Sequence, residues 1–139
     1  MAIESELETF MRPQLEPGER IACMLHRAHG ANSKLGYQVR HLGPLGTLLN
    51  FHATKRANRL LNFRAVVLTN QNVYVLDVSE QGEPQRVLGR SRRGNIEASY
   101  GKHVLTLRGG DMFTARLRVD GPHDAEASGL ARAMGGAAH

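Results

Sequence analysis

Short apolar runs separated by turn-forming residues fill the chain from Phe63 to Val119, and this alternation limits the possible folds more than any other feature. Runs of this length, rich in Val, Leu and Tyr, favour β-strands. Residues 70–72 are Asn-Gln-Asn, and asparagine tolerates the positive φ of a tight hairpin, so the first two runs are predicted to form one. Strands are expected at 63–69, 73–78, 86–89, 96–100, 103–108 and 113–119.

The last predicted strand has the clearest two-residue period. Phe113, Ala115, Leu117 and Val119 alternate with Thr114, Arg116 and Arg118. Successive side chains of a strand point to opposite faces of the sheet. One face of this strand is therefore predicted to be buried, and the other to be solvated and basic.

Helices are predicted on both sides of this β region. Ser5 and Glu8 have capping-box spacing before a short helix that Pro13 ends. Pro122 opens a C-terminal helix that Gly135-Gly136 ends, with Ala127, Leu130, Ala131 and Met134 as its apolar stripe. Residues 21–26 are predicted to form a strand, preceded by a type II turn at Pro17-Gly18. Residues 30–46 are predicted to be loop, and residues 45–61 a helix with leucines on one side.

Together these elements predict a mainly β fold. Seven antiparallel strands would form a sandwich or partly open barrel, capped by the C-terminal helix and preceded by a short N-terminal helix. Residues 1–14 form an N-terminal helical appendage in this interpretation. Residues 15–136 form the domain, with a helix-containing insertion at about 30–62.

Two motifs resemble the bacterial pleckstrin-homology-like family, including its GRAM-like members. Residues 15–21, Leu-Glu-Pro-Gly-Glu-Arg-Ile, are similar to the family's entry into its first strand. Residues 66–76 are similar to a hairpin of the same family. The resemblance covers about 15–135 and implies a non-catalytic docking module. The chain departs from the family's eukaryotic members in having no tryptophan, and it lacks the spacing of phosphoinositide-binding motifs.

Composition limits location and chemistry. The chain has 139 residues and one cysteine, which excludes an internal disulfide and a multi-cysteine zinc site. The acidic N-terminus lacks signal-peptide features, and no apolar run approaches the length of about 20 residues that a bilayer crossing needs. A cytoplasmic protein, with peripheral membrane attachment as an option, is therefore expected.

Charge divides the chain into three parts. Residues 1–20 carry a net charge of −3, residues 21–118 of +10 and residues 119–139 of −2, for a total of +5. A basic body suits an acidic partner, although a solvated face explains the same charge. The candidate binding residues form two sets. The first lies on the predicted 45–61 helix and consists of Lys55, Arg56 and Arg59. The second lies in and just after the predicted 86–89 strand and consists of Arg86, Arg90, Arg92 and Arg93. The second set equally suits protection of a sheet edge.

No catalytic or metal-binding pattern stands out. Cys23, His26 and His29 are spaced like metal ligands, but regular alternation on a strand would place His26 opposite the other two. The chain has no nucleophile elbow, phosphate-binding loop or dinucleotide motif, so neither an enzyme nor a cofactor is expected. An aromatic content of 5% argues against a nucleic-acid partner.

Two functions remain as hypotheses. In the first, the domain docks on a protein partner, which could be a second copy of itself. In the alternative, the basic body binds anionic lipid or another polyanion at a membrane surface. Only the second interaction is expected to be strongly screened by salt.

Overall fold

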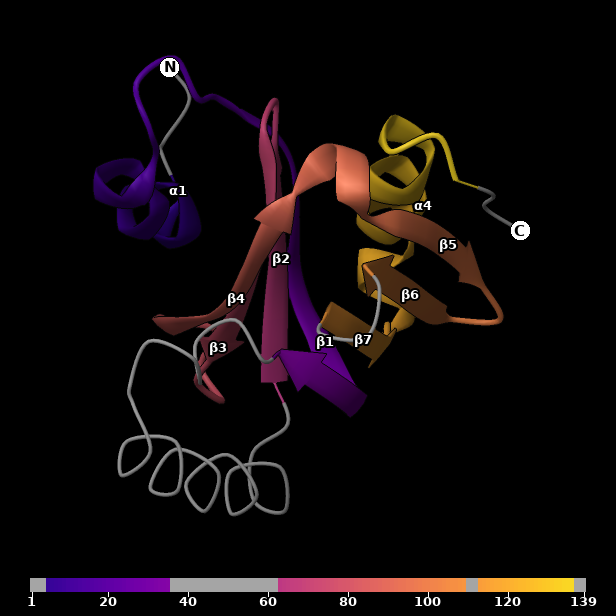
Figure 1. Ribbon diagram of the computed structural model, residues 1–139. Helices are drawn as coiled ribbons and strands as arrows, with labels where there is room; N and C mark the ends of the chain where they lie inside the picture. Colours follow the sequence, from indigo (N-terminus) through magenta and orange to yellow (C-terminus); the bar gives the residue numbers. More distant parts are fainter. Residues whose placement is uncertain (1–4, 36–62, 110–112, 137–139) are drawn as a thin grey trace, which may run out of the picture.

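The computed structural model describes residues 5–35, 63–109 and 113–136, without the side chains of 31–35 and 113. Helix α1 (Glu6–Met11) precedes strands β1 (Ile21–Leu35), β2 (Phe63–Thr69), β3 (Asn72–Val78) and β4 (Pro84–Arg92). Strands β5 (Glu97–Gly101), β6 (Val104–Gly109) and β7 (Phe113–Arg118) follow, and α4 (Asp124–Ala133) ends the fold (Figure 1). No helix among these residues is long and apolar enough to cross a membrane.

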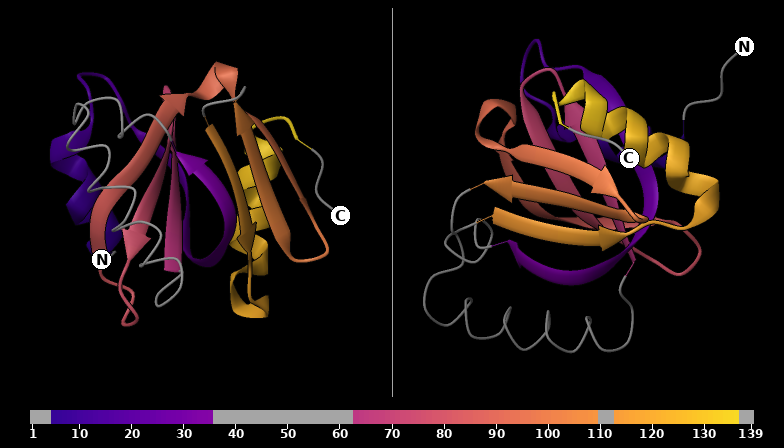
Figure 2. Two further views of the ribbon diagram at one scale, coloured as in Figure 1. Left: turned by 60° about the horizontal axis from the view of Figure 1, so that its bottom comes forward. Right: turned by 90° about the vertical axis from the view of Figure 1, so that its right-hand side faces the viewer.

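The strands form one open antiparallel sheet in the order β4-β3-β2-β1-β7-β6-β5. Strand β1 joins its two halves, because residues 21–29 pair with β2 and residues 29–35 pair with β7. Register shifts between Leu25 and Ala28, and between Gly30 and Ser33, interrupt the regular pairing of β1. Such irregularities bend a strand, and the two halves of the sheet face each other (Figure 2). The predicted mainly β fold with seven antiparallel strands is confirmed.

The main core lies between the two halves and α4. Inward residues of β1–β3 meet those of β5–β7 there, with Ala127, Leu130 and Ala131 of α4 completely buried. The predicted apolar stripe of this helix is confirmed, and Met134 packs against the same core. The predicted alternation of β7 is also confirmed, because Ala115 and Leu117 are buried and the intervening Arg116 and the following Arg118 are exposed.

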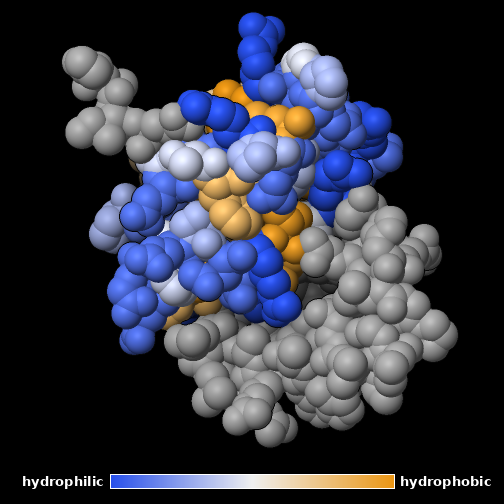
Figure 3. Space-filling model, turned by 90° about the vertical axis from the view of Figure 1, so that its left-hand side faces the viewer, coloured by the Kyte–Doolittle hydropathy of each residue, from blue (hydrophilic) through white to orange (hydrophobic). Residues whose placement is uncertain are grey.

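Helix α1 covers the opposite face of the β1–β4 half. Leu7 and Met11 are buried against Ala65, Val67, Tyr74, Leu76 and Val78, so β2 and β3 are enclosed on both faces. The Ser5 side chain accepts a hydrogen bond from the Glu8 N–H at 3.2 Å, as the predicted N-cap requires. Partly buried apolar residues surround this contact, and Figure 3 shows hydrophobic surface among hydrophilic residues on this side.

A buried carboxylate connects the start of β1 to the β2–β3 hairpin. Glu19 is 6% exposed, and its two oxygens accept hydrogen bonds from Thr69 Oγ1 at 2.5 Å and from Asn72 Nδ2 and Tyr74 OH at 2.9 Å. The Glu16 N–H donates a further bond at 2.9 Å. Burial raises the pKa of Glu19, but the hydrogen bonds outweigh it and lower the pKa below its ordinary value.

Three local predictions need correction. Residues 30–35 are part of β1 instead of loop, because β7 provides a pairing partner for them. Strand β4 extends over 84–92 instead of 86–89, because it pairs along the whole of β3. The β2–β3 hairpin is present, but its asparagines do not have positive φ; among described non-glycine residues only Lys102 (53°) and His103 (62°) do.

Helix α4 ends in the predicted glycine pair. The Gly135 N–H donates to Arg132 O and the Gly136 N–H to Ala131 O, each at 2.9 Å, and Gly135 has a φ of 78°. These two backbone hydrogen bonds form a Schellman cap. The predicted 45–61 helix lies outside the described residues.

Candidate docking surface

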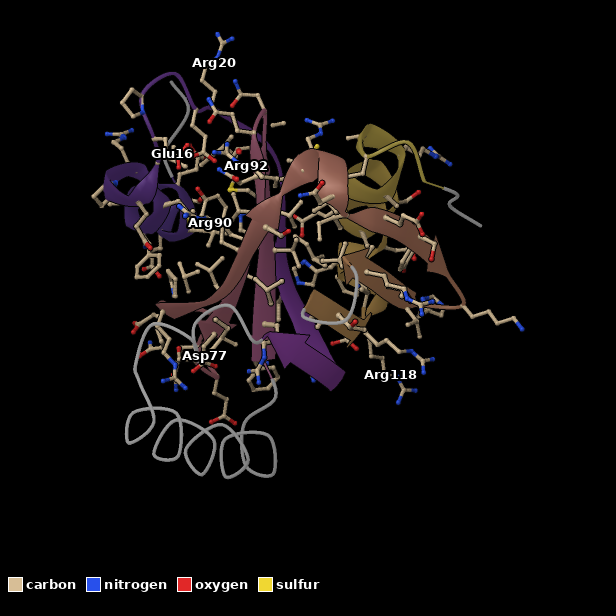
Figure 4. The ribbon with its side chains drawn as sticks, viewed as in Figure 1. Glu16, Arg20, Asp77, Arg90, Arg92 and Arg118 are labelled. Atoms are coloured by element: carbon tan, nitrogen blue, oxygen red, sulfur yellow. The ribbon has the colours of Figure 1, made fainter. Side chains whose placement is uncertain are left out.

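The arginines predicted from the sequence lie along and just after β4, which is an edge strand of the sheet. Arg90 NH1 lies 3.7 Å from Glu16 Oε1, and Arg92 NH1 lies 3.8 Å from Glu16 Oε2. In Figure 4 these two arginines lie beside Glu16 at the turn before β1. Both therefore already face a carboxylate within the chain.

Arg86 belongs to a separate group around Asp77. Its Nε lies 3.7 Å from Asp77 Oδ2, while NH1 of the buried Arg64 donates to Asp77 Oδ1 at 3.1 Å. Figure 4 places Asp77 well apart from Glu16. Arg86 and the Arg90–Arg92 pair thus do not share one site.

Arg93 has a third environment, at the junction between the hairpin and the end of α4. Its NH1 donates to Thr69 O at 3.2 Å, and its NH2 donates to Ala133 O. Carbonyls at a helix C-terminus lack partners inside the helix. Arg93 therefore links α4 to the sheet, and the four arginines do not converge on a single anion. Lys55, Arg56 and Arg59 lie outside the described residues.

A second group of arginines lies on the outward face of β6 and β7. Arg108, Arg116 and Arg118 are all exposed. Their Cα partners across the ladder are Thr114 for Arg108, Thr106 for Arg116 and Val104 for Arg118. Cross-strand partners and every second residue share a face, so the three side chains form one row, which we call the arginine face.

The arginine face differs from the arginines of β4 in its ion pairing. Within the described part of the chain, no carboxylate lies within salt-bridge distance of Arg108, Arg116 or Arg118. Glu97 is the register partner of Arg108 on β5, and it is exposed. Arg118 extends outward from the sheet in Figure 4, and the right view of Figure 2 shows β5–β7 in front of the other strands.

The sequence pattern pointed to part of this surface. The alternation of residues 113–119 predicted that Arg116 and Arg118 face solvent, as they do. Arg108 was not singled out, because its place beside them depends on the register of the β6–β7 ladder. The two-residue turn at Lys102–His103 sets the register of β5 against β6 in the same region.

The Cys23, His26 and His29 triplet does not form a metal site. His26 Nδ1 lies 2.5 Å from Glu126 Oε2 and His29 Nε2 lies 3.1 Å from Asp120 Oδ2, while Cys23 packs, partly buried, against the core. The irregularity after Leu25 breaks the alternation assumed from the sequence, and both histidines reach carboxylates of the C-terminal segment. Among described residues, no group of three or more His, Cys, Asp or Glu side chains is arranged to hold a metal ion.

The arginine face presents hydrogen-bond donors of a kind that suits an anion. A guanidinium presents a planar set of donors that matches a carboxylate or phosphate with two parallel hydrogen bonds. Strands hold Arg116 about 7 Å from Arg118 along β7 and about the same distance from Arg108 across the ladder.

Comparisons of the chain with family models, with curated proteins and with solved structures found no match.

Proposed function

We propose that this protein is a non-catalytic docking module that binds an acidic protein surface through the arginine face. The observation that carries the proposal is the contrast between two sets of arginines. Those of β4 face Glu16 and Asp77, whereas Arg108, Arg116 and Arg118 are exposed and form no ion pair with a carboxylate of the described residues, although Glu97 is the register partner of Arg108. An ion pair with a partner can form there without first breaking one between described residues.

The fold is consistent with the family resemblance. The Leu-Glu-Pro-Gly-Glu motif leads into β1, and residues 66–76 form the core of the β2–β3 hairpin. Seven strands followed by a helix are the element order that the pleckstrin-homology-like resemblance implies. This agreement supports a binding role over an enzymatic one, because the resemblance implies a docking module.

The surroundings of the arginine face favour a protein partner over a lipid surface. Amphipathic helices that lie in a membrane surface insert apolar side chains beside their basic residues. On β5–β7, the described residues of this face are polar apart from Gly101 and the half-buried Val104. A flat row of guanidiniums between threonines suits carboxylates on a protein, where two hydrogen bonds form with each arginine.

Charge reversal tests the proposal. The variant carries Arg108→Glu, Arg116→Glu and Arg118→Glu. The control carries Arg12→Glu, Arg20→Glu and Arg132→Glu, which are exposed on other parts of the protein and change the net charge equally. Calorimetry at two salt concentrations measures the affinity for poly-L-glutamate. We expect this affinity to fall about tenfold or more in the variant, because each exposed ion pair contributes about 0.2–1 kcal/mol and charge reversal adds repulsion. The control is expected to lose much less affinity.

Three results would decide against the proposal. Equal losses in the variant and the control would show that net charge alone governs binding. Binding to vesicles of phosphatidylcholine and phosphatidylserine without binding to poly-L-glutamate would favour the lipid alternative. Unchanged binding in the variant, with loss on reversal of Lys55, Arg56 and Arg59, would move the contact to the insertion.

The native partner can then be identified through the same surface. A photo-crosslinking residue at Thr106, which lies opposite Arg116 in the ladder, would be within reach of a bound partner. Cross-links that disappear in the Arg108, Arg116 and Arg118 variant but persist in the control are expected. A cross-link to a second copy of the chain would identify the partner as the protein itself.

A further inference from the structure

The surface that carries the arginine face continues across β1 to the first residue of β2. Arg118 of β7 is the register partner of His29 on β1, and His29 is in turn the register partner of Phe63 on β2. Register partners share a face of the sheet. The rings of His29 and Phe63 contact each other accordingly, with their centroids 5.0 Å apart. The outward faces of β7, β1 and β2 therefore form one continuous surface at this level.

A fourth arginine lies on this continuation. The guanidinium carbon of Arg27, on β1, lies 4.2 Å from the centroid of the Phe63 ring, which attracts a cation placed over its face. The hydrogen bond with His29 is the main cause of the lowered pKa of Asp120, and the charge of Arg27 adds to it. Arg27 is thus near Asp120, but it forms no ion pair within salt-bridge distance among the described residues.

The four arginines follow one line at nearly equal spacing. Arg116 and Arg118 are two residues apart on β7, which separates them by about 7 Å. Arg108 is a diagonal neighbour of Arg116 across the β6–β7 ladder, and diagonal neighbours are about 7–8 Å apart. Arg27, two residues before His29, stands in the same relation to Arg118. Because β7 lies between β6 and β1, both diagonals run in the same direction, and the line spans about 22 Å.

We propose that the partner is an extended acidic segment whose alternate carboxylates bind the four arginines in turn, from Arg108 to Arg27. This inference rests on the proposed function, because three of the four arginines form the arginine face. Every second side chain of an extended chain points to the same side, at intervals of about 6.7 Å, so four of them cover about 20 Å. That length and spacing match the line of guanidiniums.

A helical partner fits the line less well. Residues four apart in an α-helix rise by about 6 Å, but each step also turns the side chain by about 40° around the helix axis. After three steps the fourth carboxylate points about 120° away from the first. A straight helix therefore reaches two neighbouring arginines of the line and not all four.

Arg27 has a particular role at one end of the line. Its contact with Phe63 restricts the guanidinium before a partner arrives, so less side-chain freedom is lost on binding. The carboxylate of Asp120 repels an acidic partner at the same end. Arg27 is therefore expected to extend the site while contributing less affinity than the fully exposed Arg116.

Nuclear magnetic resonance titration of the full chain with two synthetic peptides tests the proposed line. One peptide carries four glutamates at alternate positions between threonines, which favour an extended chain. The other carries four glutamates at every fourth position between alanines, which favour a helix. The alternating peptide is expected to bind about two- to thirtyfold more tightly, because about two more exposed ion pairs form. Equal affinities would overturn the inference.

Single substitutions test the part that Arg27 plays. Arg27→Gln is expected to lower the affinity for the alternating peptide about twofold, whereas Arg132→Gln, which removes the same charge from an exposed site on α4, is expected to lower it less. Phe63→Leu keeps every charge and removes the ring. It is expected to weaken binding in the natural protein but not when Arg27→Gln is also present. If Phe63→Leu does not fold, Arg27→Gln decides alone.

Failure of this inference can be told apart from failure of the proposed function. If Arg27→Gln binds the alternating peptide as well as the natural protein does, the line does not reach β1, and the arginine face remains the docking site. If the triple charge reversal of the arginine face leaves the affinity for this peptide unchanged, the proposed function itself is wrong. An equal effect of Phe63→Leu with and without Arg27→Gln would overturn the role given to the ring.

Discussion

Replacing Glu19 by glutamine tests whether the buried carboxylate holds β1 to the β2–β3 hairpin. The substitution keeps the shape of the side chain and removes one acceptor oxygen. One Glu19 oxygen accepts from the Asn72 amide, and the other accepts from the Glu16 backbone N–H. The Glu16 backbone N–H cannot reverse its role, whereas the hydroxyls of Thr69 and Tyr74 can. A glutamine with its NH₂ group toward Glu16 therefore places two N–H groups against each other, and one with its NH₂ group toward Asn72 requires the Asn72 amide to turn over and give up its present donor role.

The expected cost follows from these contacts. Leaving a buried donor without an acceptor costs about 1–3 kcal/mol, and each hydrogen bond to a charged group is worth about 1.5–3 kcal/mol. Glu19→Gln is therefore expected to lower the free energy of unfolding by about 2–4 kcal/mol. That is a large part of the 5–15 kcal/mol that is usual for a domain.

Urea unfolding at pH 7, followed by far-ultraviolet circular dichroism, measures this loss. Glu97→Gln is the matched control, because Glu97 is exposed and such changes usually stay within about 0.5 kcal/mol. A loss below about 0.5 kcal/mol in Glu19→Gln would refute the reasoning, because the carboxylate would then not be needed where it lies.

The pH dependence gives a second test of the same residue. The folded-state pKa of Glu19 lies below the unfolded value near 4.5, so its contribution is complete above pH 4.5 and is lost as the pH falls through the folded-state pKa. The stability difference between the natural protein and Glu19→Gln is therefore expected to narrow on acidification from pH 5 to pH 3. A constant difference over that range would show that the charge of Glu19 does not contribute.

Three further predictions concern the C-terminal cap and the tyrosines. Gly136→Ala is expected to destabilise the protein, because the new Cβ would lie 1.7 Å from the carbonyl oxygen of Ala98. Gly129→Ala lies inside α4 with open space around it and is expected to stabilise the protein by about 0.5–1 kcal/mol. Thermal unfolding measures the stability of both variants, and equal effects on stability would contradict the geometry. Tyr74 and Tyr100 have pKa values raised to about 12, so absorbance at 295 nm should show two tyrosines ionising above the usual range near 10.

The sequence alone determined the features that depend on near neighbours. The Ser5 cap, the glycine pair after α4 and the alternation of β7 involve residues a few positions apart. Propensity, capping and side-chain period act over that range, so a pattern in the chain is enough to predict them. The same reasoning predicted the number of strands and the fold class.

Only the tertiary structure decided features whose partners are distant in the chain. Residues 30–35 became strand because β7 lies beside them, although their glycine, asparagine and serine resemble a loop. Asn70 binds Arg20 N and Gly18 O, 50 and 52 positions away, instead of adopting positive φ. Contacts with the segment just before β1 outweigh the local preference of the turn.

The candidate surfaces depended on the tertiary structure for the same reason. Arg90 and Arg92 look like an anion site in the sequence, and only the fold brings Glu16 beside them. Arg108 joins Arg116 through the ladder register, and His26 meets Glu126 across 100 positions. The charge of each residue is written in the chain, but whether that charge is already paired depends on which distant side chain the fold places within about 4 Å.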